Sequence, residues 1–322
     1  MDGVNDQGLH PAVRRIVREH GGDGDLLALL GNALSGADLT ALLLEVMRRR
    51  AAAVTPADVL AAYQRDRFVR PAAVDPRRVL EVGLLALDAV VPPFAPVATS
   101  PLVPLGAHSA VAGVHQNRVI ATVRRSEVAA DPTNSLALEA AVRRRRLLAD
   151  DRRSTDVVRL ASVDRVVRAQ LFDGPRSFAH FTLLGLVSAG RDTGDQTFEF
   201  ESMREHLRAL ATVTNRLGFN HVAIELTDFG AHHHGVLDAL AASMATGDIT
   251  MSIRPDRTAA RGYYPNVCFK LSVMDDGEDV EVGDGGIVPW TQTLVGSNKE
   301  RLMISGLGLE RLALMHARGR FR

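Results

Sequence analysis

Cysteine is almost absent from this sequence of 322 residues, in which Cys268 is the single one. No intrachain disulfide can form, and the composition fits a reducing compartment. An excess of one charge is also missing: Lys plus Arg and Asp plus Glu number 38 each, so the net charge of the whole molecule does not favour binding to nucleic acid.

Long apolar runs are missing as well. The apolar stretch at 79–91 is broken by Glu81 and Asp88 and is shorter than the ~18 residues of a membrane span. No signal peptide is visible, so we expect a cytoplasmic protein without a membrane partner.

Residues 1–75 are expected to form a helical N-terminal extension. Ser35 and Thr55 are N-cap candidates ahead of apolar helical patterns, and the proline after Thr55 suits a first helical turn. The segment 71–76 combines two prolines with an aspartate, which favours a break in the helices. We place the domain boundary there, so that residues 76–322 form the second domain.

From residue 76 onward, helical patterns are interleaved with short apolar segments. Helices are expected over 76–90, 134–148 and 203–217. The segments expected to be strands are Arg118–Val123, Val157–Leu160, Leu183–Val187, Val222–Leu226 and Val267–Val273. Their hairpin-like spacing predicts an α+β fold, with an antiparallel sheet and helices packed on one face.

The residues with the clearest chemical signal lie near the C-terminus, in the run Ile304-Ser-Gly-Leu-Gly-Leu-Glu-Arg-Leu312. A strand there leads through two glycines, which allow close backbone approach, into a helix that begins with Glu310 and Arg311. An arginine on a first helical turn presents a planar pair of donors suited to phosphate. The pattern therefore indicates a phosphate site, although taken alone it is often structural.

This run resembles motif 3 of class II aminoacyl-tRNA synthetases, a Gly-x-Gly-x-Glu-Arg-Leu turn from strand to helix. Residues 166–185 are similar to motif 2, in which an arginine precedes a variable loop and a phenylalanine stands four residues before a glycine. The resemblance implies that Arg311 contacts the γ-phosphate of ATP, that Arg168 contacts the α-phosphate, and that Phe181 stacks on adenine. Gln170, where the family has Glu, and the loop residue Arg176 complete the expected ATP-binding set.

A third match is to the histidyl branch of that family. The run Arg261-Gly-Tyr-Tyr-Pro-Asn-Val-Cys-Phe269 is similar to the branch signature Arg-Gly-Leu-x-Tyr-Tyr-x-x-Thr-Val-Phe, shortened by two residues. The branch arginine acts at the activated carboxylate in place of a metal, so the resemblance implies that role for Arg261 and no metal ligand in the protein. Tyr263 and Tyr264 are then expected in the substrate pocket.

The substrate side departs from the histidyl branch. The glutamate that holds the substrate ammonium in that branch is matched by Thr133, and Asp131 is a candidate to replace its charge. Trp290 and Gln292 stand where the branch has a different conserved stretch. With Tyr263 they would shape another pocket, so we do not expect histidine as the substrate.

Two functions remain open. The first is an enzyme that uses ATP and Mg²⁺ to convert an amino acid or a similar carboxylate into an acyl-adenylate. The acyl group would pass to a small molecule, a carrier protein or a protein amine, so a carrier protein or an enzyme is a possible partner. We expect no anticodon-binding domain and do not expect tRNA as a partner. The second is a noncatalytic regulator similar to the regulatory subunit of ATP phosphoribosyltransferase. In both, the resemblance implies a homodimer formed through residues 78–104, the motif 1 region.

Overall fold

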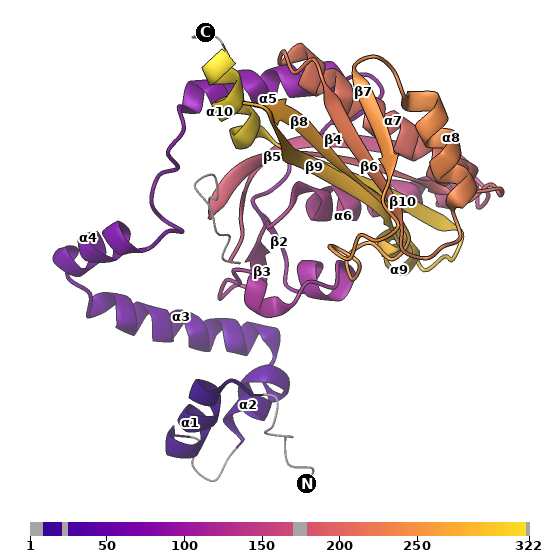
Figure 1. Ribbon diagram of the computed structural model, residues 1–322. Helices are drawn as coiled ribbons and strands as arrows, with labels where there is room; N and C mark the ends of the chain where they lie inside the picture. The colour runs from indigo at the N-terminus through magenta and orange to yellow at the C-terminus, as the bar shows by residue number, and fades with distance from the viewer. Residues whose placement is uncertain (1–8, 21–24, 170–178, 320–322) are drawn as a thin grey trace. The chain divides into compact units, whose positions relative to one another are not determined.

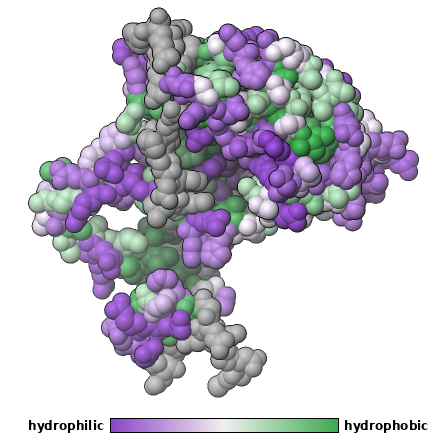
Figure 2. All heavy atoms as spheres, viewed as in Figure 1, coloured by the Kyte–Doolittle hydropathy of each residue, from purple (hydrophilic) through white to green (hydrophobic). Residues whose placement is uncertain are grey.

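The computed structural model describes residues 9–20, 25–169 and 179–319. By their internal contacts these separate into two compact units. The smaller unit ends at Arg65 and also includes Thr122–Arg125, and the larger unit contains the rest from Asp66 on. No described helix is long and apolar enough to cross a membrane. Figure 2 shows hydrophilic residues interspersed with hydrophobic ones on the visible face of the larger unit.

The smaller unit is helical, as the sequence predicted. It contains α1 (Pro11–His20), α2 (Leu26–Ala28) with a following π-type turn, α3 (Gly36–Ala52) and α4 (Pro56–Arg65). The Ser35 hydroxyl accepts a hydrogen bond from the backbone N–H of Asp38 at 3.1 Å and so caps α3, as expected. None of the described residues in these four helices is buried, so the unit has no closed apolar core.

Within the described residues of the larger unit, eight strands form one sheet in the order β1-β4-β5-β10-β9-β8-β6-β7 (Figure 1). The six central strands from β4 to β6 pair antiparallel, whereas β1 and β7 join the two edges in parallel. The strands are β1 (Ala95–Pro96), β4 (Val158–Val167), β5 (His180–Arg191), β6 (Val222–Asp228), β7 (Ile249–Ile253), β8 (Val267–Asp275), β9 (Glu278–Val288) and β10 (Glu300–Gly308). A separate small sheet pairs β2 (Leu102–Pro104) with β3 (Ser126–Val128).

Helices cover both faces of the large sheet, which confirms the predicted α+β fold of a sheet flanked by helices; only the narrower expectation that the helices pack on one face was wrong. One apolar cluster contains residues of α5 (Pro76–Val90), α7 (Thr197–Arg216), α8 (His234–Met244) and α10 (Leu309–Gly319). The other contains residues of α6 (Pro132–Asp150) and α9 (Trp290–Val295). Strand residues alternate between the two, with Leu186 in the first and Val187 in the second. Central strands such as β5 are buried on both faces, which hides the alternation that would have indicated the second layer.

The prediction of a strand at Arg118–Val123 was also wrong. A 3₁₀ turn spans Gln116–Arg118, and His115 caps it by accepting a hydrogen bond from the backbone of Asn117 at 3.2 Å. Only Ala121 forms an isolated bridge, to Glu127. Local side-chain capping outweighs the apolar alternation in this segment.

Candidate functional site

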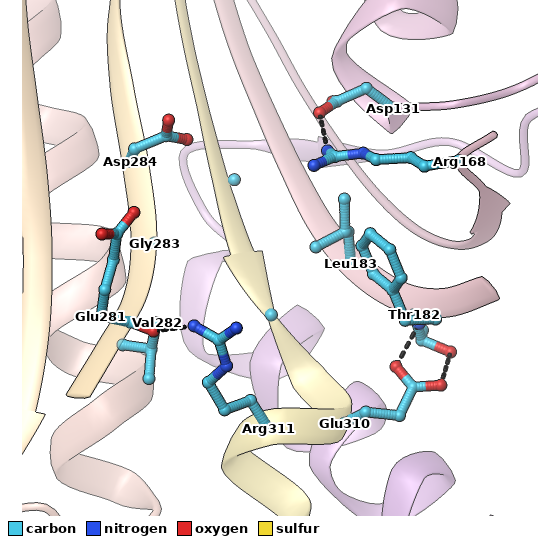
Figure 3. Close-up of a pocket in the computed structure, with 13 residues that line it drawn as sticks. Asp131, Arg168, Thr182, Leu183, Glu281, Val282, Gly283, Asp284, Glu310 and Arg311 are labelled. Carbon is cyan, nitrogen blue, oxygen red and sulfur yellow. Dashed lines mark hydrogen bonds and ion pairs between the residues drawn. The ribbon is translucent and has the colours of Figure 1, made fainter. Parts of the chain in front are cut away.

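A cavity of about 270 Å³ lies where β5, β9 and β10 meet the start of α10 (Figure 3). Arg168 and Arg311 both line it, although 143 positions separate them in the sequence. The cavity is also lined by Asp131, Phe181, Glu281, Asp284, Gly306 and Glu310. The two arginines that the sequence pattern indicated therefore line one cavity.

Arg311 is held at the first turn of α10. Its Nη1–H donates to the carbonyl oxygen of Glu281 on β9. The preceding residue, Glu310, is buried and accepts hydrogen bonds from the backbone N–H and the hydroxyl of Thr182 on β5. Arg165 on β4 also donates to Glu310, at 2.9 Å. Glu310 thus fixes the start of α10 to the sheet, a positioning role that the sequence pattern did not indicate (Figure 3).

Arg168 follows β4 on the other side of the cavity. Its Nε–H donates to the carbonyl oxygen of Ala130 at 3.0 Å, and its Nη2–H donates to Oδ2 of Asp131 at 2.8 Å. The Arg168 Cζ atom lies 5.1 Å from the centre of the Phe181 ring. These contacts hold the guanidinium in one orientation.

One glycine keeps the floor of the cavity open, and a second lets a helix approach the sheet beside it. Gly306 on β10 pairs with Gly185 on β5 on one side and with Asp284 on β9 on the other. A Cβ at Gly306 would meet nothing nearer than 3.7 Å, so protein packing does not require glycine there. A side chain would instead enter the cavity. At Gly185 a Cβ would lie 2.7 Å from Pro132, so glycine also lets the start of α6 approach the sheet.

A buried hydrogen bond between His108 and Glu127 supports Arg168 from behind. Nδ1 of His108 lies 2.6 Å from Oε2 of Glu127, and Nε2 of His108 accepts from the backbone N–H of Ala130 at 3.0 Å. The carbonyl oxygen of the same residue, Ala130, accepts the hydrogen bond from Arg168, so the His108 contact supports Arg168 through Ala130. Burial alone would raise the pKa of Glu127, but hydrogen bonds from Gly106, His108 and Gln116 lower it. Sequence reasoning missed this support because no local pattern links these residues.

A second cavity of about 410 Å³ shares Asp131, Arg168, Asp284 and Gly306 with the first. Thr133, Tyr263 and Tyr264 line it, and so do Arg118 and Asn134. The Tyr263 ring centre lies 4.9 Å from that of Tyr264. Burial, and then the charges of Asp131 and Asp284, raise the pKa of Tyr263 well above its ordinary range, so both phenols are neutral donors at neutral pH.

Other predicted site residues lie elsewhere. Arg261 and Gln292 line neither cavity; the Arg261 Cζ atom lies 5.4 Å from the centre of the Phe229 ring. Trp290 is buried in the α6 core cluster behind Tyr263, with ring centres 5.7 Å apart. Gln170 and Arg176 lie outside the described residues.

The donor set of the first cavity fits a nucleotide polyphosphate better than a bare metal ion. Two guanidinium groups line it, and the carboxylate of Glu281 could share a cation with bound phosphates. Within the described parts of the chain, no group of three or more His, Cys, Asp or Glu residues could hold a metal by itself.

No family model matches this chain, and no curated protein matches it. Several solved structures, however, match it in fold. Histidyl-tRNA synthetase from S. aureus is 12% identical with a TM-score of 0.57, covering 77% of this chain and 69% of that one. A histidine–tRNA ligase subunit from Alicyclobacillus acidocaldarius is 14% identical, with a TM-score of 0.55 and coverage of 79% and 98%.

A third neighbour carries both names that the sequence suggested. It is an ATP phosphoribosyltransferase regulatory subunit/histidyl-tRNA synthetase from Bacillus halodurans, 11% identical with a TM-score of 0.53, covering 77% of this chain and 83% of that one. At these identities the likeness establishes the fold. This chain has the class II aminoacyl-tRNA-synthetase-like catalytic fold, with histidyl-tRNA synthetases and an ATP phosphoribosyltransferase regulatory subunit as its structural neighbours.

Proposed function

We propose that the chain binds ATP with Mg²⁺ and activates an amino acid or a similar carboxylate as an acyl-adenylate, for transfer to an acceptor other than tRNA. The observation that carries the proposal is the convergence of Arg168 and Arg311 on one cavity. Adenylation concentrates negative charge on the α-phosphate as the carboxylate attacks, and fixed guanidinium donors stabilise that charge. Pyrophosphate is the leaving group.

Each arginine would contact a different part of the triphosphate in this reaction. Arg168, already oriented by Asp131 and Ala130, would contact the α-phosphate, and Arg311 would contact the terminal phosphates. Phe181 would stack on the adenine, since it lines the same cavity. Mg²⁺, which prefers phosphate oxygens plus one or two carboxylates, would neutralise the triphosphate beside Glu281.

The exposed α5 face supports a homodimer. Leu80 and Leu84, which belong to the motif 1 region, are 72% and 64% exposed, and both line an apolar groove. Covering such side chains with the same surface of a second copy would bury them symmetrically.

Amino-acid-dependent exchange of pyrophosphate into ATP tests the enzyme. Arg168→Ala and Arg311→Ala should each lower the exchange rate at least about 100-fold, the usual effect of removing a transition-state donor. Arg146→Ala is the matched control, because Arg146 is exposed on α6 away from both cavities. A purified wild-type protein that shows no exchange with any amino acid would refute the proposal.

The alternative is a noncatalytic regulator. It is favoured by Thr133, whose uncharged hydroxyl stands at the position of the family's ammonium-binding glutamate and donates to Asp131 at 2.7 Å. One structural neighbour bears the name of such a regulatory subunit. Co-purification with a phosphoribosyltransferase, together with histidine binding in the absence of ATP binding, would select this function.

A further inference from the structure

The wall shared by the two cavities carries two carboxyl groups in different electrostatic situations. Oδ1 of Asp131 caps α6 by accepting from the backbone N–H of Thr133 at 2.9 Å and from its hydroxyl at 2.7 Å. Oδ2 of Asp131 accepts from Arg168. The charge of Asp131 is therefore already compensated by a helix N-terminus and a guanidinium.

Asp284 on β9 has no such compensation. Among the described residues nothing forms a hydrogen bond or ion pair with its carboxyl group, which projects into the space between β9 and Arg168 (Figure 3). Lys270, its partner across β8, is 3.1 Å from Glu281 instead. Its other partner, Gly306, has no side chain to offer. The ionised carboxylate of Asp284 therefore has no positively charged group bonded to it.

The pKa of Asp284 also indicates that its negative charge is not compensated. Burial raises its pKa to about 6, the charges of Asp131 and Glu281 add to that rise, and those of Arg168 and Arg257 oppose it. The carboxyl group is still ionised at neutral pH. A positively charged group bound in the shared space would remove this electrostatic penalty.

Asn134 supplies an independent indication of a ligand. Its side chain is 4% exposed and lines the second cavity, yet its Nδ2 has no hydrogen-bond partner within the described structure. Buried donors of this kind are rarely left unpaired. An acceptor atom on a molecule in the cavity would satisfy it. Arg118, at the same cavity, would also favour an acceptor of negative charge.

We propose that the second cavity binds the substrate as an α-amino acid, with its ammonium on Asp284 and an acceptor-bearing polar side chain at Asn134. The substrate carboxylate then lies in the space shared with Arg168, where the proposed reaction needs it. This assignment rests on the proposed function and narrows its substrate from any carboxylic acid to polar amino acids. It also makes Asp284, rather than Asp131, the residue that replaces the family's ammonium-binding glutamate.

Thermal shift with each of the twenty standard amino acids, with and without ATP and Mg²⁺, tests the assignment, because a ligand bound by the folded state raises its stability. At least one amino acid with a polar side chain should raise the melting temperature of the wild type. The desamino analogue of that amino acid should not. Calorimetry should then show a loss of affinity of at least about 100-fold in Asp284→Asn and roughly 10-fold in Asn134→Ala, since a hydrogen bond to a charged group is the stronger one.

Asp279→Asn is the matched control, because Asp279 is an exposed aspartate on the same strand and should leave binding unchanged. The ligand-free melting temperature of each variant shows whether it is folded. The assignment is overturned if the desamino analogue binds as well as the amino acid, if Asp284→Asn keeps its affinity, or if no amino acid binds the wild type.

The same measurements separate this assignment from the proposed function. If ATP produces no shift and pyrophosphate exchange is absent, but an amino acid still binds in a manner that depends on Asp284, the adenylation proposal fails and the assignment stands. If instead ATP binds and Asp284→Asn activates the desamino acid at the wild-type rate, adenylation stands and the assignment fails.

Discussion

Removing the charge of Asp284 should stabilise the ligand-free protein above pH 6. The folded-state pKa of about 6 lies above the ordinary value of 3.8, so folding favours the protonated form. The wild type therefore loses stability as the pH rises from about 4 through 6. A shift of roughly two pKa units corresponds to about 3 kcal/mol at most. Asparagine has nearly the same shape and no charge, so Asp284→Asn avoids this loss.

Differential scanning calorimetry of the two proteins between pH 4 and pH 8 measures the effect. For a unit of this size, about 3 kcal/mol raises the melting temperature by roughly 6 °C, and the difference should vanish near pH 4. Asp279→Asn should follow the wild type at every pH, because Asp279 is exposed on the same strand. Equal melting temperatures of Asp284→Asn and the wild type at pH 8 would refute the claim that this carboxylate is uncompensated. The expected result is instead a variant that is more stable than the wild type and yet unable to hold an ammonium group.

Two further predictions concern the support of the site and the assembly. Glu127→Gln should lower the free energy of unfolding by about 1–3 kcal/mol, because an amide cannot accept all the hydrogen bonds now made to the buried carboxylate. Denaturant unfolding measures this loss, with Glu139→Gln on α6 as the control. An unchanged unfolding midpoint of the Glu127 variant would contradict the prediction. Leu84→Glu should convert a homodimer to a monomer in light scattering, whereas Val142→Glu, exposed on α6, should not; an unchanged mass of the Leu84 variant would place the interface elsewhere.

Local signals were sufficient for several elements. Asp75 caps α5 by accepting from the backbone of Arg77 at 3.0 Å, and Pro76 opens the helix, so the span 76–90 was predicted correctly. The turn from β10 into α10 was likewise readable from its glycines and from Arg311. In each case the residues that determine the structure lie within a few positions of one another.

Long-range pairing explains what the sequence did not reveal. Asp284 lies between glycines, and in the sequence alone such a run is typical of a turn rather than of a central strand. Only the pairing of β9 with β10 and β8 places it opposite Gly306 and beside the cavity. The support of Arg168 by His108 and Glu127 depends in the same way on contacts across 19 or more positions. Arg261 shows the opposite outcome, because a motif match selected it and the fold does not bring it to the cavities.

The neutral total charge of the chain says little about the ligands proposed for it, because charges of opposite sign lie at different places in the cavities. Arg311 and Arg168 supply cations to the first cavity, while Asp284 supplies an anion where that cavity joins the second. A nucleotide polyphosphate and an amino-acid ammonium carry opposite charges, so one site that binds both must keep its own opposite charges apart. Asp131 contributes to this separation by pairing with Arg168 from the α6 side, which leaves Asp284 as the uncompensated charge. The prediction for Asp284 is therefore also a test of the proposed division of the site into a phosphate half and an amino-acid half.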